Sequence, residues 1–332
     1  MKSNFQSGEN IVNTPSGPPV PVRTGAGGKI LVTGANGQLG KELQEIACNY
    51  EEFEFIFLAR DDMPIEQFEL VRNIFKTIKP QYCINCAAYT AVDKAEEEKA
   101  LAFEINGEAV GVLAAICLEH ETLFIHISTD YVFDGTASLP YSETTETNPV
   151  NSYGASKLVG EEQAFLYNPE TIIIRTSWLY SSFGKNFVKT ILKRLKEKDE
   201  INVVNDQLGS PTYGADLAEV ILQIITRLHT HPARTYPFST GGHSPLTTHG
   251  GIYHYSNEGI INWYEFAIEI KKLSGSSCKI NPITTEEYPT PAKRPAYSVL
   301  DKTKIQQTFG INLKNWKESL AICIDKIKNA IN

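Results

Sequence analysis

The stretch Lys29-Ile-Leu-Val-Thr-Gly-Ala-Asn-Gly-Gln-Leu-Gly40 decides the fold of this chain. It opens with a short apolar run, Lys29–Thr33, which is typical of a buried strand. A glycine-rich turn follows, and an amphipathic helix then runs from about Gln38 to Cys48. A strand that passes through such a turn directly into a helix is the opening unit of a doubly wound parallel sheet.

The glycines of this turn have the spacing G-x-x-G-x-x-G. Gly34 permits the tight turn, Gly37 lets the backbone approach a pyrophosphate, and Gly40 lets helix and strand pack closely. The amides at the start of the helix then face the phosphates. The pattern predicts dinucleotide binding.

Strands and helices alternate along the rest of this half of the chain. The expected strands are Lys29–Thr33, Phe53–Leu58, Tyr82–Asn85, Leu123–Ile127 and Thr171–Thr176. The expected helices are Gln38–Cys48, Glu66–Ile78, Glu97–Glu119, one from about Ser152, and Asn186–Lys198. Such alternation predicts crossover connections and an α/β fold, a doubly wound parallel (Rossmann) sheet covered on both faces.

The chain divides into three parts. Residues 1–28 are rich in Pro, Gly and Ser and predict a disordered leader or tag. Residues 29–176 form the predicted dinucleotide-binding core. Residues 177–332 are expected to be a smaller, mainly substrate-binding region, with some elements returning to the core. The expected elements there are a strand at Ile201–Val204, a helix at Gly214–Leu228, a loop from His229 to Gly250, a strand at Ile252–Tyr255, a helix at Asn262–Leu273, a loop at Pro282–Arg294 and a helix at Trp316–Ile331.

Composition excludes several classes of function. The chain has 332 residues, 42% of them hydrophobic, and a formal net charge of -8. The negative charge argues against nucleic acid as a partner, and no uninterrupted apolar run approaches the ~20 residues of a membrane span. Cys83 and Cys86 lie in an apolar strand and read as core residues rather than a metal or redox pair. We therefore expect a cytoplasmic protein.

The end of the second strand bears on the choice of nicotinamide cofactor. The ribose of NADH is usually bonded by an acid at this position. Here the position holds Ala59, and Arg60, which follows, can face a 2′-phosphate. This favours NADPH, although Asp61 or Asp62 could supply a carboxylate for NADH. At the end of the third strand, Ala87-Ala88-Tyr89 offers small residues where a cofactor would cross the sheet.

The stretch Asn151-Ser-Tyr-Gly-Ala-Ser-Lys157 places Tyr153 and Lys157 on one face of a helix. The unperturbed pKa of tyrosine is near 10, and a neighbouring ammonium lowers it. The pair is therefore a candidate general acid for an alkoxide that forms on a carbonyl carbon.

Hydroxyl groups end the fourth strand, in Ile127-Ser-Thr-Asp130. Either Ser128 or Thr129 could bond the substrate oxygen as negative charge develops on it. Asp130 could bind a substrate hydroxyl.

Taken together, these motifs resemble the extended short-chain dehydrogenase/reductases, and within them the dTDP-4-dehydrorhamnose reductase family. The motifs run in family order from Lys29 to about Asp301. They are Thr-Gly-Ala-Asn-Gly-Gln-Leu-Gly, Asn-Cys-Ala-Ala-Tyr-Thr-Ala-Val-Asp-Lys-Ala-Glu, Ser-Thr-Asp-Tyr-Val-Phe-Asp-Gly, Tyr-Gly-Ala-Ser-Lys, Arg-Thr-Ser-Trp-Leu-Tyr, Gly-Lys-Asn-Phe, Asp-Gln-Leu-Gly-Ser-Pro-Thr and Arg-Pro-Ala-Tyr-Ser-Val-Leu-Asp.

The resemblance implies a role for each matching residue. Tyr153 would donate the proton, Lys157 would bind the nicotinamide ribose and lower the pKa of the tyrosine, and Thr129 would complete the catalytic group. Thr129 and Asp130 would touch the sugar, and Trp178 would pack on it. The residues implied to contact the cofactor are Gly34, Gly37, Gln38, Leu39, Gly40, Arg60, Ala87, Ala88, Tyr89, Tyr153 and Lys157.

The implied reaction is the reduction of the C4 keto group of dTDP-4-dehydro-β-L-rhamnose by NADPH or NADH. The expected partner is the dTDP-sugar, and the expected assembly is a monomer or homodimer. Alternatives are another nucleotide-linked 4-keto sugar, or a non-catalytic regulatory subunit on the same fold. Two features bear on cofactors. Pro64-Ile65 stands where the family commonly has Asp-Ile near the adenine. Magnesium is implied by family analogy only, because no residues here have metal-ligand spacing.

Overall fold

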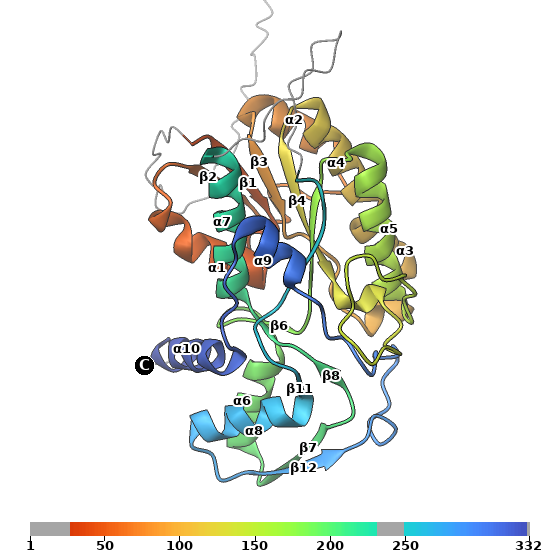
Figure 1. The fold of residues 1–332 in the computed structure, drawn as a ribbon, viewed down its shortest axis with the longest axis vertical. Helices are drawn as coiled ribbons and strands as arrows, with labels where there is room; N and C mark the ends of the chain where they lie inside the picture. Colours follow the sequence, from red (N-terminus) through yellow and green to blue (C-terminus); the bar gives the residue numbers. More distant parts are fainter. Residues whose placement is uncertain (1–26, 231–248, 331–332) are drawn as a thin grey trace, which may run out of the picture.

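A computed structural model of the chain describes residues 27–230 and 249–330. Most of the predicted leader, and residues 231–248 of the predicted loop, lie outside this range. The described residues form an upper α/β body and a smaller lower lobe, as seen in Figure 1.

The upper body is built on a parallel sheet, as predicted. Its strand order is β10-β5-β4-β3-β1-β2. The bounds are β1 Lys29–Thr33, β2 Glu54–Leu58, β3 Tyr82–Asn85, β4 Leu123–Thr129, β5 Ile172–Thr176 and β10 Gly251–Tyr255. The order reverses between β1 and β3, where a doubly wound sheet opens a ligand crevice at the carboxyl ends of its strands.

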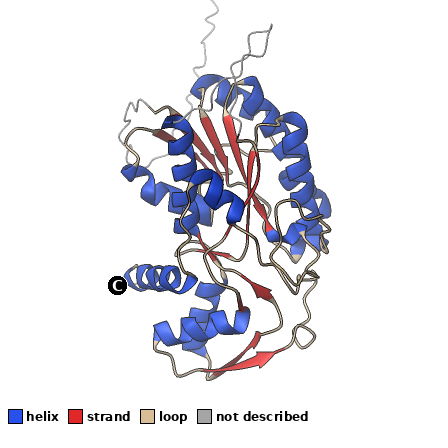
Figure 2. Ribbon diagram, viewed as in Figure 1, coloured by secondary structure: helices blue, strands red, loops and turns tan. Residues whose placement is uncertain are grey.

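Helices cover both faces of this sheet, as Figure 2 shows. Alternate residues of each strand point to opposite faces. Ile30 and Val32 of β1 therefore pack with α1 (Gln38–Ile46) and α7 (Gly214–Thr230). Leu31, between them, packs with α2 (Phe68–Ile78), α4 (Ala109–Glu119) and α5 (Ser152–Tyr167).

The helix predicted over Glu97–Glu119 is confirmed over Lys99–Glu119, but it is not α-helical throughout. A π-helical turn (Glu104–Glu108) separates α3 (Lys99–Phe103) from α4. Within the turn, the Asn106 side chain accepts from Tyr89 N at 2.9 Å and donates to Tyr89 O at 3.0 Å and to Ser156 Oγ at 3.0 Å. A side chain that bonds a distant backbone in this way is a tertiary cause of a π-bulge.

The stretch Lys99–Glu119 is also the one part of the described chain that is long and apolar enough to cross a membrane by length and composition. Most of it is buried against the sheet and α5, so it is a core helix rather than a membrane span.

The lower lobe surrounds a separate apolar cluster. Its elements are β6 Leu179–Tyr180, α6 Phe187–Glu197, β7 Glu200–Val204, β8 Leu208–Gly209, β9 Thr212–Tyr213, β11 Ile261–Asn262, α8 Trp263–Ser274, β12 Lys279–Ile283 and α10 Trp316–Asn329. Three elements of the second half of the chain belong to the upper body: α7, β10 and α9 (Thr303–Phe309). Sequence periodicity missed α9, β12 and the two-residue strands because such short segments carry too little pattern.

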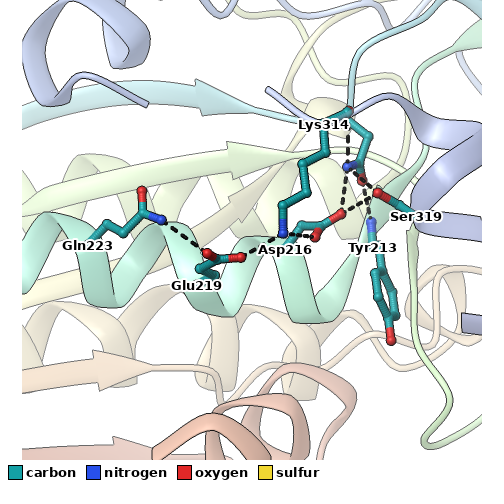
Figure 3. Close-up of polar contacts among 7 residues, drawn as sticks. Tyr213, Asp216, Glu219, Gln223, Lys314 and Ser319 are labelled. Carbon is teal, nitrogen blue, oxygen red and sulfur yellow. Dashed lines mark hydrogen bonds and ion pairs between the residues drawn. The ribbon is translucent and has the colours of Figure 1, made fainter. Parts of the chain in front are cut away.

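A polar network joins α7 to the C-terminal segment (Figure 3). Asp216 of α7 is buried and accepts hydrogen bonds from Asn257 at 2.7 Å and from Ser319 of α10. Lys314 bridges Asp216 at 3.0 Å and Glu219 at 2.7 Å. These contacts connect one helix of the upper body to residues distant in sequence.

Candidate active site

A cleft of about 640 Å³ lies between the two bodies, at the carboxyl ends of the central strands. The glycine turn and the start of α1 form one side, and α5 and the segment after β5 form the other. The predicted site residues that line it are Gly37, Gln38, Leu39, Ala88, Thr129, Asp130, Tyr153, Lys157 and Trp178.

Helix α5 is fixed at its start, which positions Tyr153. Asn151 caps it by accepting from Gly154 N at 2.8 Å. A Cβ on Gly154 would lie 2.1 Å from Tyr131 O, so only glycine allows this approach. The ring of Tyr131 meets the ring of Tyr153 edge-on, with centroids 5.6 Å apart.

Tyr153 faces a hydroxyl and a carboxyl group from the end of β4. Burial raises the pKa of Tyr153 to about 12, a hydrogen bond with Thr129 lowers it, and the charge of Asp130 raises it. Thr129 Oγ1 donates to Asp130 Oδ1 at 3.0 Å. Burial also raises the pKa of the Asp130 carboxyl to about 7, and its Oδ2 has no partner among the described residues.

The sequence left open whether Ser128 or Thr129 bonds the substrate oxygen, and the structure places the two hydroxyls differently. Ser128 Oγ donates to Glu161 Oε1 at 2.5 Å, and Glu161 is held in turn by Arg175. The hydroxyl of Ser128 is therefore committed to a buried ion pair. Thr129, by contrast, faces Tyr153 and lowers the pKa of its phenol.

Lys157 is buried on the same face of α5 as Tyr153. Its ammonium nitrogen contacts Ile127 O at 2.7 Å and His126 Nε2 at 3.1 Å. Burial lowers the pKa of Lys157 to about 8. The expected lowering of the tyrosine pKa is absent here: burial raises the pKa of Tyr153, and Lys157 is directed to the β4 backbone instead.

The glycine turn fits a dinucleotide. A Cβ on Gly34, whose φ is +62°, would lie 2.6 Å from Ala87 N, and one on Gly40 would lie 2.6 Å from Gly34 O. No side chain caps α1 at Gly37, so its first amides remain open to the cleft. Backbone amides at a helix start are suited to pyrophosphate.

A side pocket of about 190 Å³ continues from the glycine turn to Arg60. Ala87, Ala88 and Pro64 also line it. The side chain of Arg60 is 67% exposed and pairs with Glu66 at 3.2 Å. Asp62 Oδ2 accepts from Ala59 N at 2.9 Å, which occupies one of the carboxylates considered for NADH.

Two predicted cofactor residues do not line the cleft or the side pocket. Tyr89 turns its hydroxyl to Glu98 at 2.6 Å, and its backbone binds Asn106. Gly40 instead serves the close packing of α1 against the turn, as its own Cβ distances require.

Trp178 lies directly after β5 with a left-handed backbone, φ 48°. Its ring stacks on Trp263 of α8, with centroids 3.6 Å apart and planes 9° apart. The sequence did not indicate a role for Trp263 in the site, because Trp263 and Trp178 lie far apart in the chain and only the fold brings them together. Trp263 is fixed by a bond from Nε1 to Gln207 Oε1 at 3.2 Å.

A second pocket of about 320 Å³ adjoins the cleft at Tyr131 and extends into the lower lobe. Its walls are aromatic and its polar groups include two arginines. Residues of this pocket that the sequence reading did not assign are Asp93, Arg194, Asn202, Gln207, Trp263, Tyr288 and Arg294. Arg294 pairs with Asp93 at 2.9 Å, which joins the late Arg-Pro motif to the motif after β3.

No magnesium site is supported. Among residues 27–230 and 249–330 there is no group of three or more His, Cys, Asp or Glu side chains that could hold a metal ion. Carboxylates that do lie near each other are paired with lysines, such as Glu42 and Glu45 with Lys326.

Known proteins resemble this chain over nearly its whole length. A family model described as the RmlD substrate binding domain matches residues 28–329. A dTDP-4-dehydrorhamnose reductase of Aggregatibacter actinomycetemcomitans is 40% identical over 298 residues, which covers 88% of this chain and 97% of the relative.

Solved structures of dTDP-4-dehydrorhamnose reductases also resemble this chain over nearly its whole length. The crystal structure of a dTDP-4-dehydrorhamnose reductase from Clostridium acetobutylicum has a TM-score of 0.81 and 43% identity, and the match covers 90% of this chain and 99% of that one. The Bacillus anthracis dTDP-4-dehydrorhamnose reductase in complex with NADP has a TM-score of 0.81 and 36% identity with the same coverage. This chain belongs to the dTDP-4-dehydrorhamnose reductase family, on an extended short-chain dehydrogenase/reductase fold.

Proposed function

We propose that this enzyme reduces the C4 keto group of dTDP-4-dehydro-β-L-rhamnose with NADPH or NADH and so forms dTDP-L-rhamnose. The observation that carries the proposal is one cleft lined by the glycine turn, Thr129, Tyr153, Lys157 and Trp178. Family membership supports the same reaction.

The bound nicotinamide supplies the hydride. Tyr153 donates its phenolic proton to the oxygen on which negative charge develops. Thr129 faces Tyr153 and so orients the phenol. Its one hydroxyl proton is given to Asp130 Oδ1, and it can donate to the same substrate oxygen when it turns from that carboxylate. Lys157 holds the nicotinamide ribose. Holding the reacting groups in this arrangement supplies much of the rate.

The proposed cofactor site runs from the cleft into the side pocket. The amides of Gly37, Gln38 and Leu39 would hold the pyrophosphate, and the side pocket near Arg60 and Ala88 would hold the adenosine half. Arg60 is exposed enough to turn from Glu66 to a 2′-phosphate, which supports NADPH as the preferred cofactor. The relative solved with NADP supports the same choice.

The proposed sugar site is the face of Trp178 beside Thr129 and Asp130. The nucleotide diphosphate then extends into the second pocket, where Arg194 and Arg294 can neutralise phosphate charge. This assigns residues 177–332 mainly to the substrate and residues 29–176 to the cofactor. We also propose a cytoplasmic enzyme, because all the described cysteines are free, and a monomer or homodimer.

The test is direct. Purified protein is mixed with the keto-sugar nucleotide and NADPH or NADH, and nicotinamide absorbance is followed. Substrate-dependent oxidation of at least one cofactor is expected. Absence of oxidation with both would contradict the proposal, and a panel of other nucleotide-linked 4-keto sugars would show whether the sugar was misassigned.

Tyr153→Phe separates catalysis from binding. Because the phenol supplies the proton, we expect kcat to fall by about 100-fold or more, with cofactor affinity within about twofold of the parent protein. Cofactor binding is measured by NADPH fluorescence. A variant with near-normal kcat would show that Tyr153 is not the acid.

A further inference from the structure

Behind Lys157, on the side away from the cleft, a chain of buried polar groups crosses the sheet from β1 to α5. Thr33 Oγ1 donates to Asn85 Oδ1 at 2.6 Å, and Asn85 Nδ2 lies 3.0 Å from His126 Nδ1. His126 Nε2 lies 3.1 Å from Lys157 Nζ. Thr33, Asn85 and His126 are almost completely buried, so none of these contacts is replaced by solvent.

We propose that Asn85 and His126 are positioning residues that present an imidazole N–H to Lys157, so that the neutral amine of Lys157 can accept a hydrogen bond on the side away from the cleft and the ammonium form is disfavoured. This goes beyond the reaction itself and, for its effect on turnover, rests on the proposed function.

One backbone amide shows which groups in this series of hydrogen bonds donate and which accept. Ala87 N lies 3.2 Å from Asn85 Oδ1 and 3.2 Å from Thr33 Oγ1. A backbone amide only donates, so the Asn85 atom facing it must be the carbonyl oxygen. The amide NH₂ of Asn85 then faces His126 Nδ1, and that ring nitrogen must be the acceptor.

A neutral imidazole carries one proton. His126 is neutral because burial lowers its pKa well below the ordinary value, and the neighbouring Lys157 lowers it further. With Nδ1 accepting from Asn85, the proton is on Nε2 and points at Lys157 Nζ. A neutral amine can accept it, whereas an ammonium would set one N–H against another.

Lys157 therefore holds its third proton weakly. Burial lowers the pKa of Lys157 to about 8, while the charge of Glu161 on α5 raises it. Burial raises the pKa of the nearby Cys86 thiol, which therefore stays neutral. Glu161 is already paired with Arg175 of β5. On the cleft side, the other titratable groups that line the same cavity are Tyr153, Asp130, Tyr131 and Lys185.

The consequence for turnover concerns its alkaline limit. If the ammonium is the form that supports Tyr153, activity falls as pH rises through the pKa of Lys157, near 8. The Asn85–His126 pair would place that limit lower than burial alone does. Reversing the donor and acceptor roles along the hydrogen bonds from Asn85 to Lys157 should raise this alkaline limit.

Asn85→Asp reverses the direction of the hydrogen bonds from position 85 through His126 to Lys157, and the side chain keeps almost the same shape. One carboxylate oxygen still accepts hydrogen bonds from Thr33 and Ala87, and the other now accepts a hydrogen bond from His126 Nδ1–H. His126 Nε2 then becomes an acceptor for the Lys157 ammonium. We expect the alkaline limit of kcat/KM to rise by about one pH unit. His126→Gln, whose side-chain oxygen can also accept, should shift it in the same direction.

His254→Gln is the matched control. His254 is an equally buried histidine on β10, with Nδ1 bonded to Tyr141 O at 3.1 Å, and it does not line the cleft. Its replacement tests the general effect of losing a buried imidazole. The alkaline limit should remain unchanged.

The protonated nitrogen can be observed without substrate. In protein labelled with ¹⁵N-histidine, long-range ¹H–¹⁵N correlation shows which ring nitrogen of His126 carries the proton, and His126→Gln assigns the signal. We expect Nε2–H in the parent protein and Nδ1–H in Asn85→Asp. Nδ1–H in the parent protein, or an alkaline limit that does not move in Asn85→Asp, would overturn the proposal. If no keto sugar is reduced, the proposed function fails, but the NMR result still decides this inference.

Discussion

At the scale of single residues, Trp178 combines a costly backbone with a fixed ring. A left-handed φ of 48° is rare for a bulky side chain. Such strain costs about 1–3 kcal/mol and persists where surrounding contacts compensate for it. Here the ring is held between Trp263, which stacks on it, and the backbone of Gly209. Strain beside Thr129 and Tyr153 supports a functional role for the indole.

Gly209→Ala should disturb Trp178 and the neighbouring Ser298 hydroxyl, whose Oγ would lie 2.8 Å from the added Cβ. An added Cβ would lie 2.6 Å from Trp178 Cε2, so the indole must move. We expect the KM for the keto-sugar nucleotide to rise about tenfold, with KM for NADPH unchanged, since overpacking of this kind costs about 1–3 kcal/mol. Steady-state kinetics and tryptophan fluorescence measure the two effects.

Gly275→Ala controls for the loss of a glycine. Its φ is +72° and a Cβ there meets nothing within 4 Å, so the cost is backbone strain of about 1 kcal/mol. Stability should fall while the KM for the sugar stays constant. Equal effects of both variants on KM would remove Trp178 from the proposed sugar site.

At the scale of elements, helix α8 carries Trp263 on its first turn. The turn is closed by a capping box in which Asn262 accepts from Glu265 N at 2.8 Å and Glu265 accepts from Asn262 N at 2.9 Å. The cap therefore determines how firmly Trp263 supports Trp178.

Asn262→Ala should lower the free energy of unfolding by about 1 kcal/mol and also raise the KM for the sugar. The second effect arises because a frayed first turn loosens Trp263. Urea titration and steady-state kinetics give the two values.

Asn315→Ala removes the same kind of cap from α10, where Asn315 accepts from Lys317 N at 2.9 Å. It should cost a similar amount of stability without changing the KM. If Asn262→Ala also left the KM unchanged, α8 would be a structural support only.

At the scale of the whole molecule, the upper body depends on the C-terminal segment. Asp216 is almost fully buried in α7 and has donors from three separate parts of the chain (Figure 3). Buried donors that lose their acceptor remain desolvated, so this carboxylate stabilises the junction as a unit.

Asp216→Ala should lower the free energy of unfolding by about 2–3 kcal/mol, because Asn257, Ser319 and Lys314 lose their common acceptor. Gln223→Ala, at the exposed end of the same network, should change it by less than about 0.5 kcal/mol. Both are measured by urea denaturation. A small effect of Asp216→Ala would mean that apolar packing alone joins α10 to α7.

Several features of the site were open to sequence reasoning because their causes are local. The glycine turn, the parallel sheet and the helix that carries Tyr153 and Lys157 depend on spacing within a few residues. The sequence could not decide between Ser128 and Thr129, because the answer depends on the carboxylate of Glu161, 33 residues from Ser128. The π-helical turn at Asn106 likewise depends on Tyr89 and Ser156.

The sequence by itself determined the parallel sheet and the glycine turn, and it predicted Tyr153 and Lys157 as the proton-transfer residues. Periodicity and glycine geometry are properties of short segments, and these features need nothing more. Only the tertiary structure decided which groups Lys157 contacts, that Trp263 supports Trp178, and that Arg294 reaches Asp93. Those contacts join segments far apart in the chain, and burial at the places where they meet sets the proton affinities.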